Sequence, residues 1–207
     1  MIVVVDYGMG NLRSVENAFA FLGIKVKISD SPEVLRKAKK IIFPGVGHFG
    51  KTIEELKTRR IFDILKEKIN KGVPYLGICI GMQILFEGSE ESPDKEGLGI
   101  IKGTVKKLKA GKIVVPHMGW NRIKINKSIV DNKENLLFKG IKDGSFFYFV
   151  HSYYCLPEEK KIITSITNYG VEFASSVHKD KVWALQFHVE KSQSLGLKIL
   201  NNFNKLC

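Results

Sequence analysis

The chain has 207 residues, of which 44% are hydrophobic and 26% charged, as in a globular protein with a sizeable core. Its formal charge of +12 comes from lysines scattered along the chain, with no basic stripe among aromatic residues, which argues against nucleic-acid binding. The three cysteines show neither CxxC nor Cys/His spacing, which argues against a disulfide framework and a zinc site. No apolar run approaches the roughly 20 residues that span a bilayer.

The first half of the chain alternates short apolar strands with helical patterns. Strands are predicted at 2–5, 24–28, 41–43 and 75–78, as runs typical of buried parallel strands. Helical patterns are predicted at 12–22, from Ser31 onward, and as one region at 52–70. This order predicts an α/β fold with a doubly wound, mostly parallel sheet and flanking helices, whose site lies at the carboxyl ends of the strands.

The second half contains several strand patterns joined by short turns and ends in a helical pattern at 192–203. These strands add an antiparallel part to the predicted sheet. No repeat, linker or low-complexity segment divides the chain, so one domain covering 1–207 is expected. The apolar start at 2–5 is too short for a signal peptide, which predicts a cytoplasmic protein. The strand patterns of this half lie near Val105 and at 113–115, 123–125, 146–150, 162–167, 173–177 and 182–187.

Two glycine-rich turns follow predicted strands. The turn containing Gly8 and Gly10 lacks the third glycine of a dinucleotide-binding loop, so we expect an ordinary tight turn and no cofactor. The segment 77–81, GICIG, has instead the form of a nucleophile elbow around Cys79. Such a turn strains the nucleophile's backbone and brings its sulfur near a helix N-terminus, which favours a thiolate. A buried structural cysteine is the alternative.

A nucleophilic cysteine needs a base, and His188 has a carboxylate two residues away, Glu190. Because residues i and i+2 of an extended segment face the same way, Glu190 could orient the His188 ring and complete a triad. The negative tetrahedral intermediate also needs hydrogen-bond donors. The N–H of Ile80 is one candidate, and Val46 or Gly47 in the turn after the neighbouring strand is another.

Together these segments resemble the class I glutamine amidotransferases of the triad type, over essentially the whole chain. Within that family the chain is most similar to the glutaminase subunits of imidazole glycerol phosphate synthases. The resemblance implies that Cys79 attacks the side-chain amide of glutamine, that His188 moves the proton, and that Glu190 orients His188. The segments that carry it are 6–12 (DYGMGNL), 44–47 (PGVG), 77–83 (GICIGMQ), 116–121 (PHMGWN), 151–153 (HSY) and 186–192 (QFHVEKS).

The resemblance also implies how substrate and partner are held. Gln83 would face the bound glutamine, Glu91 would lie near its amino group, and the backbone of Ser152 and Tyr153 would hold its carboxylate. The implied partner is a (β/α)₈-barrel cyclase subunit that receives the ammonia and makes imidazole glycerol phosphate and an aminoimidazole carboxamide ribonucleotide. The positions implied at the interface with that partner are Asn11, Met118, Trp120 and Lys191.

Two positions depart from the family pattern. Val189 stands between His188 and Glu190 where the family usually has proline, which loosens that turn. His48 stands beside the expected oxyanion turn, where a smaller residue is common. Three alternatives stay open: a paralogous subunit that feeds ammonia to the amidination of bacterial surface sugars, a cysteine hydrolase or chaperone-like protein on the same type of sheet, and a binding module with an inert cysteine.

Overall fold

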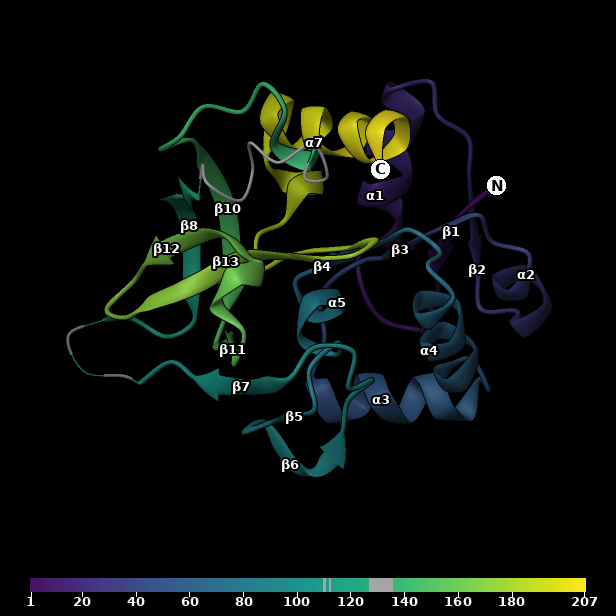
Figure 1. The fold of residues 1–207 in the computed structure, drawn as a ribbon, viewed down its shortest axis with the longest axis horizontal. Helices are drawn as coiled ribbons and strands as arrows, with labels where there is room; N and C mark the ends of the chain where they lie inside the picture. Colours follow the sequence, from purple (N-terminus) through teal and green to yellow (C-terminus); the bar gives the residue numbers. More distant parts are fainter. Residues whose placement is uncertain (110, 112, 127–135) are drawn as a thin grey trace.

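A computed structural model describes residues 1–109, 111, 113–126 and 136–207 of the chain. A central sheet of eight strands crosses the molecule in the order β2-β1-β3-β4-β14-β13-β12-β9 (Figure 1). Strands β2, β1, β3, β4 and β14 are parallel, while β13, β12 and β9 continue the sheet antiparallel. The predicted fold class is therefore confirmed.

The first half of the chain supplies the parallel strands and most of the helices, which cover both faces of the sheet (Figure 1). Alternate residues of the strand at 2–5 point to opposite faces of the sheet, as the two-residue period of a strand requires. Val3 and Val5 pack in the core with α3 and α4, whereas Val4 packs in the core with α1 and α7. The elements are β1 (Ile2–Val5), α1 (Leu12–Phe21), β2 (Val26–Ser29), α2 (Pro32–Arg36), β3 (Lys40–Phe43), α3 (Phe49–Thr58), α4 (Phe62–Asn70), β4 (Tyr75–Ile78) and α5 (Ile80–Gln83).

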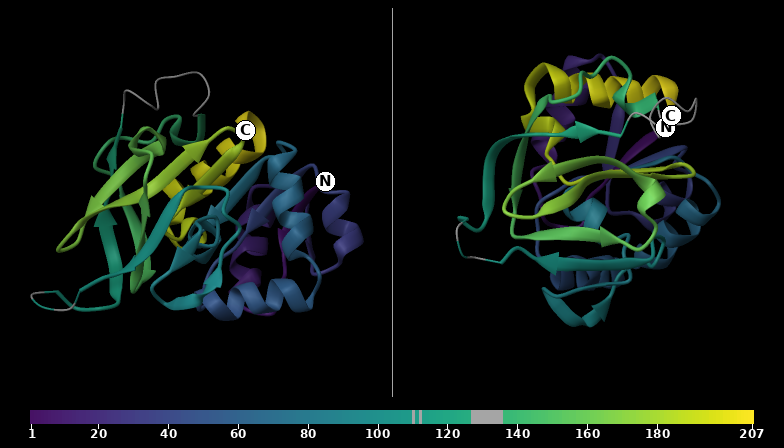
Figure 2. Two further views of the ribbon diagram at one scale, coloured as in Figure 1. Left: turned by 60° about the horizontal axis from the view of Figure 1, so that its bottom comes forward. Right: turned by 60° about the vertical axis from the view of Figure 1, so that its left-hand side comes forward.

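The second half contains the antiparallel strands, most of which form the end of the molecule remote from the N-terminal helices, whereas the short strands at 88–96 lie against α3 (Figure 1 and Figure 2). Besides completing the main sheet, it forms a ribbon of β10 with β8 and a sheet in the order β11-β7-β5-β6. Its elements are β5 (Gly88–Ser89), β6 (Ser92–Glu96), β7 (Gly103–Lys107), β8 (His117–Arg122), β9 (Lys124–Ile125), β10 (Phe146–His151), β11 (Tyr153–Pro157), β12 (Ile163–Asn168), β13 (Glu172–Lys179), β14 (Val182–Leu185) and α7 (Gln193–Leu206), with short 3-10 turns at Leu136–Phe138, Lys160–Ile162 and Val189–Lys191.

Several predicted elements differ from the structure. The helical region at 52–70 is two helices, because the chain turns through Arg60, whose φ is +58°. Residues 113–115 form bends rather than a strand. The strand predicted at 182–187 ends at Leu185, so the chain leaves the sheet before His188. Strands β5, β6, β8 and β11 were not predicted; β6, for example, is a polar segment with a proline, which gives no hydrophobic alternation.

None of the helices in the described part of the chain has both the length and the hydropathy needed to cross a bilayer. Within the same residues, no three histidine, cysteine or acidic side chains gather as metal ligands would. The three cysteines form no disulfide.

Candidate active site

Cys79 sits on the sharp turn that the sequence predicts, between β4 and α5. Its φ of +51° and ψ of −102° lie outside the regions that side chains other than glycine normally adopt. The two flanking glycines are needed for close packing: a Cβ on Gly77 would lie 2.3 Å from the Gly81 carbonyl oxygen, and one on Gly81 would lie 2.5 Å from the Phe43 carbonyl oxygen. The backbone strain and these close approaches match the geometry of a nucleophile elbow.

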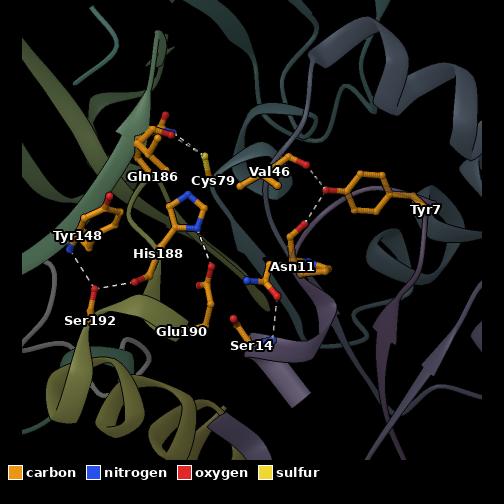
Figure 3. A network of polar contacts seen from close by, with 12 residues as sticks. Tyr7, Asn11, Ser14, Val46, Cys79, Tyr148, Gln186, His188, Glu190 and Ser192 are labelled. Atoms are coloured by element: carbon orange, nitrogen blue, oxygen red, sulfur yellow. Dashed lines mark hydrogen bonds and ion pairs between the residues drawn. The ribbon is translucent and has the colours of Figure 1, made fainter. Parts of the chain in front are cut away.

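The carboxylate of Glu190 orients the His188 ring. Its Oε1 lies 2.7 Å from Nδ1 of His188, and both side chains are almost completely buried. Nε2, the other ring nitrogen, has no hydrogen-bond partner among the described residues and lies on the Cys79 side of the ring (Figure 3). Burial lowers the pKa of His188, but the negative charges of a Cys79 thiolate and of Glu190 outweigh that effect and raise the pKa to about 10. The imidazolium is therefore the stable form at neutral pH when the thiolate is present.

The backbone around His188 is held by Ser192, a residue to which the sequence assigned no role. Its buried hydroxyl donates to the His188 carbonyl at 2.6 Å and accepts from the Tyr148 N–H at 3.0 Å, while the His188 N–H donates to the Tyr148 carbonyl at 2.8 Å (Figure 3). These three bonds fix the backbone of His188 to β10. The sequence shows a serine four residues after His188 but not its burial, so it gave no signal for this role.

The sulfur of Cys79 contacts the side chain of Gln186, which in turn contacts Gln83. Nε2 of Gln186 donates to Sγ at 3.6 Å, and Oε1 of Gln186 accepts from Nε2 of Gln83 at 3.4 Å. Gln83 also donates to the Tyr153 carbonyl at 3.1 Å, so two of the residues predicted to hold substrate contact each other. The sequence pattern assigned no role to Gln186, which lies in the bend that follows β14.

The expected oxyanion turn lies against the elbow. A Cβ on Gly45 would stand 2.2 Å from the Ile78 carbonyl oxygen, so only glycine allows this approach. The Tyr7 hydroxyl donates to the Val46 carbonyl at 2.8 Å and lies on the side of Val46 opposite Cys79 (Figure 3). Because carbonyl and N–H of a trans peptide point in opposite directions, the Gly47 N–H is directed away from Tyr7. The N–H groups of Val46, Gly47 and Ile80 donate to no other group of the described residues.

Two further residues predicted to bind substrate have structural contacts. Oε2 of Glu91 accepts from the Phe49 N–H at 2.6 Å, which caps the start of α3 in place of His48, whose side chain makes no capping bond. The carbonyl of Ser152 accepts from the Leu108 N–H at 2.9 Å. Their roles toward glutamine stay predictions.

Two of the residues predicted at the partner interface, Trp120 and Lys191, contact the ring of Tyr148. Met118 and Trp120 lie on β8 with 62% and 46% of their surface exposed, and Trp120 meets the edge of the Tyr148 ring. Nζ of Lys191 lies over the Tyr148 ring, 5.6 Å from its centroid. Asn11 is exposed and caps α1 by accepting from the Ser14 N–H (Figure 3). Exposed aromatic and apolar side chains gathered in this way are typical of a contact surface.

Comparison with known proteins gives one consistent family. The model of the family described as glutamine amidotransferase class-I matches residues 3–206. A protein of Pyrococcus furiosus named imidazole glycerol phosphate synthase subunit HisH is 49% identical over 99% of this chain and 98% of its own length. A protein of the same name from Thermococcus kodakarensis is 47% identical over the whole of both chains. A crystal structure titled as a glutamine amidotransferase superposes with a TM-score of 0.75 at 20% identity, covering 100% of this chain and 98% of its own. At that identity the superposition supports the fold alone.

Proposed function

Because this chain belongs to the class-I glutamine amidotransferase family, we propose that it hydrolyses L-glutamine to glutamate and ammonia as the glutaminase subunit of an imidazole glycerol phosphate synthase. The observation that carries the chemistry is the strained Cys79 elbow beside the His188 ring, which Glu190 contacts at 2.7 Å. The full-length similarity to several HisH subunits favours the histidine pathway over sugar amidination.

In the proposed mechanism the Cys79 thiolate attacks the side-chain carbonyl carbon of glutamine. A C–S bond forms, and the carbonyl electron pair moves to oxygen, where the N–H groups of Ile80 and of Val46 or Gly47 stabilise it. His188 gives its Nε2 proton to the nitrogen, the C–N bond breaks, and ammonia leaves a thioester. Water then attacks the thioester while His188 accepts its proton, and glutamate departs as the thiolate reforms. The raised pKa of His188, about 10, supports its first role as an acid.

The proposed partner is a (β/α)₈-barrel cyclase subunit that receives the ammonia. The exposed Met118 and Trp120, with Lys191 over Tyr148, support a docking face on β8 and β10. Aromatic side chains of this kind commonly dominate the binding energy of an interface. We further propose a cytoplasmic setting, which three free cysteines support.

The function is tested by glutamate release from glutamine, measured on the full chain with and without the cyclase subunit. Cys79→Ala should abolish release, whereas Cys207→Ala, which removes another free thiol, should leave it unchanged. Complementation of a histidine auxotroph lacking its own glutaminase subunit tests the pathway. Equal release by wild type and Cys79→Ala would refute the enzyme, and well-expressed protein that fails to complement would refute the pathway.

A further inference from the structure

Two buried histidines outside the proposed triad form a chain of hydrogen bonds. Nδ1 of His117 lies 2.9 Å from Nε2 of His151, and Nδ1 of His151 lies 2.9 Å from the Tyr153 carbonyl oxygen. At the other end, Nδ2 of Asn121 lies 3.2 Å from Nε2 of His117. Both rings are at most 5% exposed, and the proposed mechanism uses neither of them.

The chemistry of the end groups fixes the direction of every bond in this chain. A carbonyl only accepts, so Nδ1 of His151 carries the proton that it donates to Tyr153. Burial lowers the pKa of His151 to about 3 and that of His117 to about 4, so both rings are neutral. Nε2 of His151 is therefore an acceptor, Nδ1 of His117 is its donor, and Nε2 of His117 accepts from the Asn121 amide. The orientation of the Asn121 amide agrees with this assignment. Its Oδ1 accepts from the Arg122 N–H at 2.8 Å, so its Nδ2, a donor, faces His117.

This chain of hydrogen bonds joins the exposed face of β8 to the surroundings of Cys79. His117 and Asn121 lie on the same strand as the exposed Met118 and Trp120. At its inner end, the Tyr153 carbonyl also accepts from Gln83, which contacts Gln186, the side chain that donates to the Cys79 sulfur. The β10–β11 junction that carries His151 runs past the same sulfur, since the Val150 carbonyl oxygen lies 3.8 Å from Sγ.

We infer that Asn121, His117 and His151 are positioning residues that fix the Tyr153 peptide and the Gln83 side chain against Cys79 and so set the affinity for glutamine. This inference rests on the proposed function. Loss of the His117 donor leaves Nε2 of the buried His151 ring unpaired, so the His151 ring and the Tyr153 carbonyl that it contacts are free to move beside Cys79. The elbow and the His188–Glu190 pair are untouched, so the effect falls on substrate binding rather than on the chemical step.

The variants separate hydrogen bonding from packing. The centroid of the His117 ring lies 3.9 Å from that of Tyr169 and 4.8 Å from that of Phe149, and both pairs are stacked. His117→Phe therefore keeps an aromatic ring there and removes the donor to His151. His117→Asn is the rescue variant, because its amide can still donate to Nε2 of His151. Tyr169→Phe is the control. It keeps the stacking ring and loses only a hydroxyl that donates to the Val114 carbonyl, a group that does not belong to the series of hydrogen bonds from Asn121 to Tyr153.

Glutamate release is measured over a range of glutamine concentrations with the full chain and its synthase partner. His117→Phe should raise KM about tenfold, as expected for one hydrogen bond, and change kcat less than about twofold. His117→Asn should restore most of the KM, and Tyr169→Phe should match wild type. An unchanged KM in His117→Phe, or an equal rise in His117→Asn, would overturn the inference.

A second measurement needs no catalysis. In ¹⁵N-labelled wild-type protein, the ring-nitrogen NMR shifts of His117 and His151 should both report a proton on Nδ1 and none on Nε2 at neutral pH. A proton on Nε2 of either ring would overturn the hydrogen-bond chain. A wild-type chain that releases no glutamate would refute the proposed function and the kinetic part of this inference, while the tautomers would still decide the hydrogen-bond chain.

Discussion

Replacing Glu190 with glutamine removes one charge from a buried ion pair and leaves the shape of the side chain unchanged. The bond from Nδ1 of His188 to Oε1 is 2.7 Å long, and the two side chains are 0% and 3% exposed. A charge-assisted hydrogen bond contributes about 1.5–3 kcal/mol. We expect Glu190→Gln to lower kcat/KM about 10- to 150-fold, since each 1.36 kcal/mol is a factor of ten.

The same substitution changes the titration of His188 in a defined direction. The folded pKa of His188, about 10, lies above its ordinary value of 6.5, so its contribution to stability is complete below about pH 6.5 and is lost as the pH rises through 10. Glu190→Gln removes one of the two negative charges that raise this pKa, so the pKa should fall and the loss of stability should begin at lower pH.

The assays are glutamate release with the partner present and NMR titration of the ¹³C-labelled His188 ring. Glu159→Gln, which neutralises an exposed carboxylate paired with Lys161, should alter neither result. A decrease in kcat/KM of less than threefold, or an unchanged His188 titration, would refute the reasoning that Glu190 supports the imidazolium.

Three further expectations follow from other parts of the molecule. Gly45→Ala places a Cβ 2.2 Å from the Ile78 carbonyl oxygen, so the turn beside Cys79 must shift, and kcat/KM should fall about 100-fold in the glutamate assay while circular dichroism stays native. Lys40→Met removes the ammonium that donates to the Phe203 and Asn204 carbonyls at the end of α7, and should lower the free energy of unfolding by about 1–2 kcal/mol in urea titration without altering kcat. Trp120→Ala should raise the Kd for the cyclase subunit about 30-fold or more by calorimetry, and an unchanged Kd would contradict the docking face.

Local features of the sequence were enough to predict the elbow and its neighbours. The apolar runs determined the parallel strands and their order along the chain, since buried strands need continuous hydrophobic residues. The glycines around Cys79 predicted the tight turn, and their close approaches to the backbone give the reason. The two-residue spacing of His188 and Glu190 predicted their contact, which the structure has at 2.7 Å, even with Val189 in place of proline.

Strand order within the sheet was decided only by the tertiary structure, because hydrophobic period does not specify which strands pair. β14 lies parallel to β4 with Leu185 beside Ile78, so the chain carrying His188 leaves the sheet at the edge where Cys79 stands. The buried polar contacts are likewise tertiary: the bond between Ser192 and Tyr148 of β10 and the bond between His117 and His151 join segments far apart in the sequence. Each of these buried groups needs a partner that only the folded chain can supply, which is why the sequence pattern named the candidate reacting side chains but not those that hold them.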